Sequence, residues 1–147
     1  MITDRGKGLD VCTVPVTNGN VDWQSDPDLA LVSVWHRHGR NDNHASALIA
    51  GTGLRTGALA TTYAHDSHNL VVIGRNTTDM ATAANALRSS GGGYVAVSGG
   101  EVLGQVALPV AGLLSQSSVP EVAGEYASYI AAANGVGVVE NPIRLVT

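Results

Sequence analysis

Residues 58–74 read ALATTYAHDSHNLVVIG, and this stretch decides the architecture that the sequence predicts. Two apolar runs, Ala58–Tyr63 and Leu70–Ile73, have the length and the composition of strands. Between them, positions 65–69 hold two histidines, an aspartate, a serine and an asparagine. Five polar, chemically able side chains at the junction of two strands indicate a place where something binds.

Upstream of this stretch, period-two alternation predicts strands at Leu9–Val16 and Leu29–His38, with a turn at Asn18–Asn20 between them. In the second strand, odd-numbered residues share one face and even-numbered residues the other. Leu48–Leu54 is a further short apolar piece, interrupted by glycines 51 and 53. No helix follows these glycines, so a phosphate loop is disfavoured, and they indicate a bulge or a close strand crossing.

Downstream, Asn76–Asp79 begins the clearest helix, and Gly91–Gly93 ends it. Its apolar stripe has helical spacing and consists of Met80, Ala83, Ala84 and Leu87.

A hairpin is predicted next, formed by Tyr94–Val97 and Glu101–Leu108. Pro109–Leu114 is an apolar segment with a turn, which we assign to the core. Ser118 and Glu121 have capping-box spacing and open a second helix that ends at Asn134-Gly135. The stripe predicted for this helix is Val122, Ala123, Tyr126 and Ile130.

Mostly strands with two marked helices predict an α/β or α+β fold, a mixed β-sheet sandwich flanked by two main helices. A length of 147 residues favours one domain over residues 1–147. The chain has no Phe, so Val, Leu, Ile and Ala are expected to fill the core.

Composition excludes several classes of function. The formal net charge is −4 and no basic cluster is present, which argues against nucleic-acid binding. The apolar stretches are too short and too rich in glycine to span a membrane, and residues 1–8 lack the apolar core of a signal peptide. Cys12 is the one cysteine, which excludes an internal disulfide, favours the cytoplasm and is most simply a buried thiol.

The candidate site lies in the junction itself. His65 and His68 supply general bases, Asp66 an orienting carboxylate and Ser67 a hydroxyl. Neighbours in sequence rarely form a catalytic triad, so binding or orienting is favoured over nucleophilic catalysis. The other interpretation is a turn in which Asp66, Ser67 and Asn69 bond to backbone groups.

His36 and His38 form an H-x-H pair, and on a strand both rings would point to one face, as metal ligands require. With His65 and His68 they offer four imidazoles to a small metalloenzyme. No spacing brings the two pairs together, so the alternative is polar side chains at a subunit or domain contact.

Several stretches together resemble a known family. Residues 35–41, WHRHGRN, are similar to an ERHG-x-N element, and residues 51–60, GTGLRTGALA, to KGFGLKxGAIA. Residues 64–69 match AHDSHN, and Gly74 with Asp79-Met80 fits VGxNxxDM. Residues 91–93 match GGG, and residues 108–113, LPVAGL, resemble LPIAGL. Order and spacing hold over roughly residues 30–142, and they resemble the C-terminal domain of bacterial adenine deaminases, which are amidohydrolases.

The resemblance implies a part in converting adenine and water to hypoxanthine and ammonia. In the family a divalent metal, Mn, Fe or Zn, sits in a (β/α)₈ barrel that precedes this domain and activates water. Such a barrel needs on the order of 200 residues or more, so this chain does not contain one. The resemblance therefore implies a domain that acts with a barrel in cis or in trans.

In that assembly the junction would face the barrel mouth. His65 and His68 would bond the substrate or handle protons, Asp66 would orient a histidine, and Ser67 and Asn69 would contact the purine. Homo- or hetero-oligomers are expected. The alternative is a non-catalytic oligomerisation or ligand-binding module derived from the family.

Three positions depart from the family pattern. His36 stands where the family has an acid, so the H-x-H pair is not the metal motif of the barrel. His44 falls in a stretch that the family fills with small residues. Asn141–Ile143 resembles the start of the closing segment, without the apolar run expected after it.

Overall fold

The computed structural model of this protein describes residues 2–3, 8–9, 11, 13–139 and 141–146. In chain order, its elements are β1 (Ile2–Thr3), β2 (Gly8–Leu9), β3 (Val16–Thr17), β4 (Asn20–Val21), β5 (Leu29–Trp35), β6 (His44–Ala50), β7 (Ala58–Thr61), β8 (Leu70–Gly74), α1 (Thr77–Ser90), β9 (Gly93–Ser98), β10 (Glu101–Ala107), α2 (Val119–Gly135) and α3 (Pro142–Val146).

The main sheet has the strand order β10-β9-β7-β8-β5-β6-β1-β2. From β10 to β6 every neighbouring pair is antiparallel, while β1 runs parallel to β6. Strands β3 and β4 form a separate hairpin across the predicted turn at Asn18-Gly19. The predicted mixed sheet with helices is confirmed as the α+β form, and the sheet is open, without barrel closure, over the described residues.

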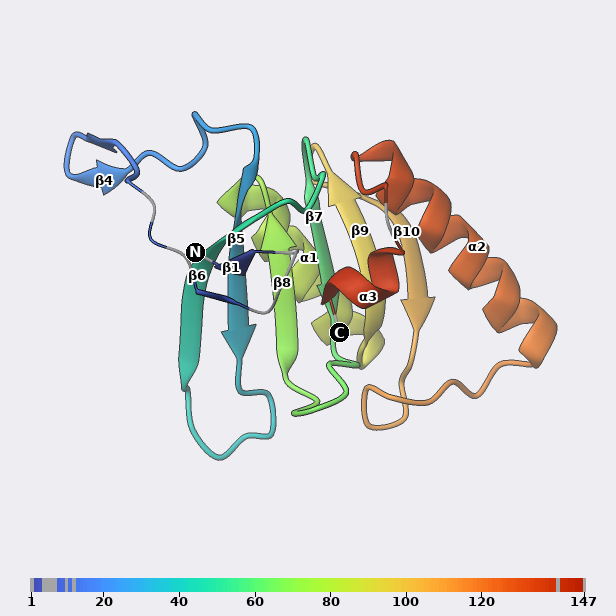
Figure 1. Cartoon of the computed structure of the whole chain (residues 1–147). Coiled ribbons are helices and arrows are strands. Elements are labelled where there is room, and N and C mark those ends of the chain that lie inside the picture. Colours follow the sequence, from blue (N-terminus) through green and yellow to red (C-terminus); the bar gives the residue numbers. More distant parts are fainter. Residues whose placement is uncertain (1, 4–7, 10, 12, 140, 147) are drawn as a thin grey trace.

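Helices cover both faces of the sheet: α1 lies behind it in Figure 1, and α2 and α3 lie in front. Strands β8 and β9 both pair with β7, so the β8–α1–β9 connection carries α1 across β7. The small side chains of Ala58 and Ala60 on β7 are fully buried under this helix. A Cβ at Gly74 would stand only 2.3 Å from the Met80 side chain. Small residues therefore allow α1 to pack close to the sheet.

The caps of α1 are those that the sequence predicts. The Asn76 side chain accepts a hydrogen bond from the Asp79 backbone N–H at 2.7 Å, and Gly91 ends the helix with φ +81°. The Asp79 carboxylate also accepts hydrogen bonds from the backbone N–H groups of Gly99 and Gly100, at 3.3 and 2.7 Å. This carboxylate ties the helix to the β9–β10 hairpin, which is itself confirmed.

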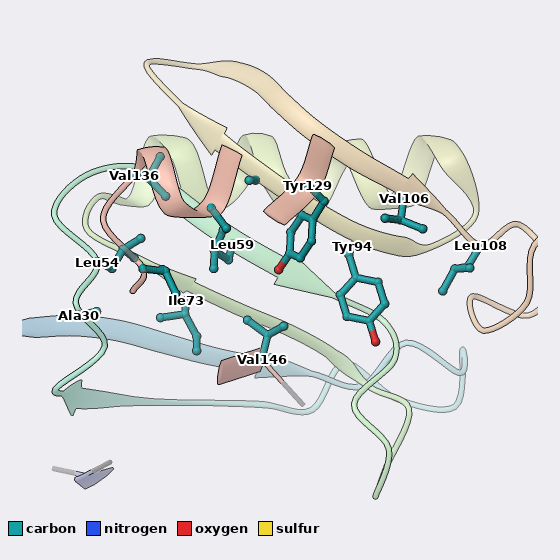
Figure 2. Close-up of a cluster of buried hydrophobic side chains, with 13 residues drawn as sticks. Ala30, Leu54, Leu59, Ile73, Tyr94, Val106, Leu108, Tyr129, Val136 and Val146 are labelled. Carbon is teal, nitrogen blue, oxygen red and sulfur yellow. The ribbon is translucent and has the colours of Figure 1, made fainter. Parts of the chain in front are cut away.

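The core on the other face contains two tyrosines, so an aliphatic core was an incomplete prediction. Tyr94 and Tyr129 are the largest fully buried side chains, and their ring centroids lie 5.6 Å apart. Figure 2 shows them among Leu59, Ile73 and Val146. The aromatic pair belongs to the buried cluster in which residues of the sheet and of α2 meet.

Helix α2 begins with the predicted capping box, and two residues of its predicted stripe, Val122 and Tyr126, are partly buried against the core. The other two are wrong. Tyr129 and Ala133 are buried, whereas Ala123 is exposed and Ile130 is 36% exposed. Gly104 on β10 explains why Tyr129 is buried, because a Cβ there would lie 2.8 Å from the carbonyl oxygen of Ser128. The helix backbone rests on this glycine, which turns the next residue, Tyr129, into the core.

Three strand boundaries differ from the prediction. The strand expected at Leu9–Val16 is wrong: residues 11 and 13–15 have no strand structure, and Val11 is 99% exposed. Strand β5 ends at Trp35 rather than His38, and β6 begins at His44 rather than Leu48. The first residues of β6 are exposed, so they lack the apolar pattern of a strand. The assignment of Cys12 as a buried thiol lies outside the described residues.

Two glycines between β6 and β7 lie against the backbone of other segments, which is a close backbone approach rather than the bulge or strand crossing that the sequence predicts at Gly51 and Gly53. Gly57 has φ +73°, and a Cβ there would lie 2.1 Å from the carbonyl oxygen of Val97. A Cβ at Gly53 would lie 3.0 Å from the carbonyl oxygen of Gly137. These residues serve backbone packing.

Candidate functional site

Four of the segments that carry the family resemblance meet at one end of the sheet. They are the connections at residues 36–43, 62–69, 91–92 and 108–118, which lie at the lower end in Figure 1. Side-chain hydrogen bonds to backbone groups join the connections at 36–43, 62–69 and 108–118. The connection at 91–92 is followed by Gly93, whose backbone N–H bonds to the Thr62 hydroxyl. Segments far apart in sequence thus form one surface.

The predicted site at residues 65–69 is a tight turn. The backbone N–H groups of Ser67 and His68 both donate to the carbonyl oxygen of Ala64, at 3.1 and 2.6 Å. His68 has φ +50°, a left-handed conformation that is uncommon outside glycine and asparagine. The Ser67 hydroxyl oxygen accepts a hydrogen bond from the Asn69 N–H at 3.4 Å. For Ser67, the turn interpretation therefore describes the local structure.

The two histidines of the turn have different surroundings. The His65 Nε2 atom lies 3.5 Å from Asp66 Oδ1, and their side chains are 64% and 92% exposed. His68 is half-buried, with its ring centroid 6.2 Å from that of Tyr63. Asp66 is thus placed to orient His65, whereas His68 lies against an aromatic ring.

Arg37 clamps the turn from the neighbouring loop. Its Nε donates to the carbonyl oxygen of His68 at 2.5 Å, and its Nη2 donates to that of Ala111 at 2.8 Å. Burial lowers the pKa of this guanidinium from its usual value. Arg37 lies within the sequence motif at residues 35–41, but the sequence alone predicts no role for it. Its planar fork of donors joins three loops at once.

Thr62 also hydrogen-bonds to neighbouring segments, and two glycines leave room for these contacts. The hydrogen bonds of Arg37 and Thr62 to the loops are together called the clamp. The Thr62 hydroxyl donates to the carbonyl oxygen of Gly112 at 2.7 Å and accepts from the Gly93 N–H at 2.8 Å. A Cβ at Gly112, where φ is +73°, would lie 2.9 Å from the Arg37 guanidinium nitrogens. A Cβ at Gly92 would lie 2.6 Å from the Thr62 hydroxyl oxygen. Only glycine fits these two positions without displacing the clamp.

The segment 109–114 is a turn at this surface, so its assignment to the core is wrong. The backbone N–H and carbonyl groups of Val110 and Leu114 bond to each other, and the two side chains are 38% and 63% exposed. Ala111 adopts φ +56°, which turns its carbonyl oxygen to Arg37. The apolar residues of this segment therefore lie in a turn at the end of the sheet.

Two buried polar atoms beside the turn lack a partner among the described residues: His36 Nδ1 and Asn69 Oδ1. Trp35 and Leu70 form the last ladder pair of β5 and β8, so His36 and Asn69 occupy the next cross-strand position. An unsatisfied buried polar atom costs about 1–3 kcal/mol. The cost is recovered when a ligand or a neighbouring chain supplies the missing hydrogen bond.

The H-x-H pair is not held on a strand, because β5 ends before it. The His36 and His38 rings meet edge to face, with centroids 5.3 Å apart. The His38 Nε2 lies 3.4 Å from the carbonyl oxygen of Ser67. In the part of the chain that the structure describes, no three His, Cys, Asp or Glu side chains are grouped to hold a metal ion. The described residues therefore do not fit a resident metal.

A hollow of about 300 Å³ opens behind the clamp. Its lining residues are Arg37, Thr62, Leu70, Leu87, Arg88, Gly91 and Gly92. The turn residues 65–69 lie outside this lining, and the side chains of His65, Asp66 and Ser67 are exposed. Among the described residues, no helix is long and apolar enough to span a membrane.

Comparison with known proteins gives consistent matches along the chain. A family model described as "Adenine deaminase C-terminal domain" matches residues 7–146. Adenine deaminase 2 of Shouchella clausii is 39% identical over 154 residues, which cover 93% of this chain and 27% of that protein. The adenine deaminases of Moorella thermoacetica and Serratia proteamaculans are 48% and 50% identical, covering 79% and 78% of this chain. They cover 20% and 19% of those proteins, so the chain spans about a quarter or less of these relatives.

Proposed function

This chain belongs to the adenine deaminase C-terminal domain family, and from that premise we propose that it supports adenine deamination by a longer enzyme. In this proposal the metal-bearing barrel lies outside the chain, in the part of the relatives that it does not match. Adenine and water become hypoxanthine and ammonia, so the exocyclic amine leaves and oxygen takes its place. The domain completes the substrate site from one side.

The meeting of the loops at one end of the sheet carries this proposal. The Arg37 and Thr62 hydrogen bonds fix these loops relative to one another. A surface held by backbone-directed bonds is pre-organised, which lowers the cost of positioning a substrate. The exposure of His65 and Asp66 supports a role toward a neighbour rather than within this domain.

Each turn residue has a role that its geometry supports. Asp66 orients the His65 imidazole, which bonds to the purine or carries a proton between substrate and solvent. His68 takes a similar role from its half-buried position. Ser67 keeps the shape of the turn and offers its hydroxyl to the substrate.

Asn69 forms hydrogen bonds to the edge of the purine in this proposal. A carboxamide matches adenine because its oxygen accepts from the exocyclic amine while its nitrogen donates to a ring nitrogen. The Oδ1 atom supports this role, because it is an acceptor that no group among the described residues uses. Hypoxanthine presents an oxygen where adenine has the amine, so the contact favours substrate over product.

The metal belongs to the barrel in this proposal, and it supplies activated water there. The described residues of this chain do not fit a metal ion, so no step assigned to them runs through one. A cytoplasmic location is part of this proposal, and the single cysteine of this chain, which cannot form an internal disulfide, supports it.

The test uses a complete enzyme made by joining residues 8–146 to the unmatched part of the Moorella thermoacetica relative. We expect His65→Ala to lower kcat/KM by roughly tenfold or more, since positioned acid–base groups contribute at least that much. Glu101→Ala, at the opposite end of the sheet, is the matched control and leaves kcat/KM unchanged. Equal activity of the His65→Ala enzyme and this control overturns the proposed role of the turn.

A second function is favoured by exposed apolar residues such as Trp35, which is 44% exposed: a non-catalytic oligomerisation or ligand-binding module. Sedimentation of the 147-residue chain with and without adenine separates the two functions. A stable oligomer, together with a joined enzyme that stays active when the turn is altered, favours the module.

A further inference from the structure

Half of one sheet face is left uncovered by helices. Helix α1 packs on the strands from β8 to β10, and its side of β5 and β6 has no helix over it among the described residues. Leu31, Ser33 and Trp35 of β5 point to this side, opposite Leu48, Ser46 and His44 in the ladder. Two hollows of about 540 and 220 Å³ share Leu31 and Thr77, and together they form one groove between α1 and the β3–β4 hairpin.

The groove is neutral along its length. Its lining residues are Asn20, Val21, Trp23, Gln24, Leu31, Ser33, Trp35, Ser46, Ala47, Leu48, Val72, Thr77, Met80, Ala81 and Ala84. None of them carries a charge, although charged residues make up 14% of the chain. A continuous uncharged surface with a large exposed aromatic is typical of a contact with another folded body.

Arg75 fixes the wall of the groove on the hairpin side. Its guanidinium donates to the carbonyl oxygens of Gln24 and Asp26, both at 2.8 Å, and to that of Leu29. The Gln24 side chain donates back to the Arg75 carbonyl at 2.9 Å, and the guanidinium lies 5.8 Å from the centroid of the Trp23 ring. The groove is therefore preformed in the isolated domain.

We propose that the upstream part of the longer enzyme docks in this groove, an inference that rests on the proposed function. The family model describes a C-terminal domain, so the unmatched part of the relatives, about three quarters of their length, lies upstream of the match. The match begins at residue 7, and β2 (Gly8–Leu9) is the outermost strand on the β6 side of the sheet. The upstream chain arrives beside the uncovered strands, and it contributes a neutral, largely apolar surface to match the groove.

Docking here also sets the position of the candidate site. Trp35 closes the lower end of the groove and stacks on His44, with centroids 4.3 Å apart and planes 10° from parallel. The next residue is His36, which begins the loop that Arg37 clamps to the turn. The upstream part, when docked in the groove, therefore lies next to the loops that face the barrel in the proposed function.

Thiol labelling tests this docking surface. Ala81 is exposed on the groove wall, and Ala123 is also exposed, on α2. We place Ala81→Cys or Ala123→Cys in a Cys12→Ser background and label both the 147-residue chain and the joined enzyme. Peptide-resolved mass spectrometry gives each rate. We expect the thiol at position 81 to react at least about tenfold more slowly in the joined enzyme, and the thiol at position 123 to react equally in both.

Two outcomes overturn the proposal. Equal labelling at position 81 in the chain and in the joined enzyme shows that the upstream part does not cover the groove. Concentration-dependent protection of the chain alone assigns the groove to a second copy. The proposed function is judged separately by turnover, so protection together with an active His65→Ala enzyme leaves the docking intact and removes the role of the turn.

Discussion

Removing the Arg37 guanidinium tests the clamp that holds the loops together. Arg37→Met keeps most of the aliphatic stem and deletes the donors to the carbonyl oxygens of His68 and Ala111. A hydrogen bond from a charged group contributes about 1.5–3 kcal/mol when buried. The site is half-buried and water replaces part of each bond, so we expect a total loss of about 2–3 kcal/mol.

Urea unfolding of the 147-residue chain measures this loss as a change in midpoint at constant slope. At this chain length, it corresponds to a fall in Tm of about 4–12 °C. Arg40→Met is the matched control, because Arg40 lies exposed in the same loop, and its effect should stay within about 0.5 kcal/mol. Arg37→Lys keeps the charge but not the fork, and we expect an intermediate loss. Equal stability of Arg37→Met and Arg40→Met refutes the clamp.

Three further predictions concern glycine, aspartate and tyrosine. Gly112→Ala places a side chain against the clamp at a positive φ, so it should lower the free energy of unfolding by about 1–3 kcal/mol. Gly124→Ala lies in an open helical position and should raise the free energy of unfolding by about 0.5–1 kcal/mol. Equal effects of the two variants in thermal unfolding refute the packing argument. Burial raises the pKa of the Asp79 carboxyl, but hydrogen bonds outweigh it and hold that pKa below its usual value, so its stabilising effect is present above about pH 4 and fades at lower pH. The stability gap between wild type and Asp79→Asn should therefore shrink in acid, and a gap independent of pH contradicts this. Burial raises the pKa of the Tyr94 and Tyr129 phenols, so stability should fall as the pH rises above about 10. Ultraviolet absorbance follows the ionisation of the tyrosines. Ionisation of all four tyrosines near pH 10 in the folded protein, to within about one pH unit, would exclude these raised pKa values.

The parts of the fold that the sequence predicts well are those set by local chemistry. The caps of α1 and the glycine turn of the β9–β10 hairpin depend on neighbouring residues and are confirmed. Helical periodicity alone places Val122 and Tyr126 of α2 toward the core correctly. It is wrong for Ile130, because the burial of Tyr129 instead depends on Gly104, which lies on another element. The start of β6 depends on pairing with β5, because its own first residues are exposed on both faces.

The same division applies to the candidate site. The turn at residues 65–69 is visible in sequence, because five polar residues interrupt two strands. Arg37 is not, because its partners are backbone carbonyl oxygens 31 and 74 positions away. Backbone acceptors leave no trace in residue types, so only the fold identifies the clamp.

A crystal structure of the joined enzyme with a bound purine tests the central claim most directly. The account predicts that the turn at residues 65–69 lies at the mouth of the barrel, with the Asn69 amide or a turn histidine within hydrogen-bonding distance of the purine. A structure in which the purine is bound and this end of the sheet faces solvent, away from the barrel, would contradict it.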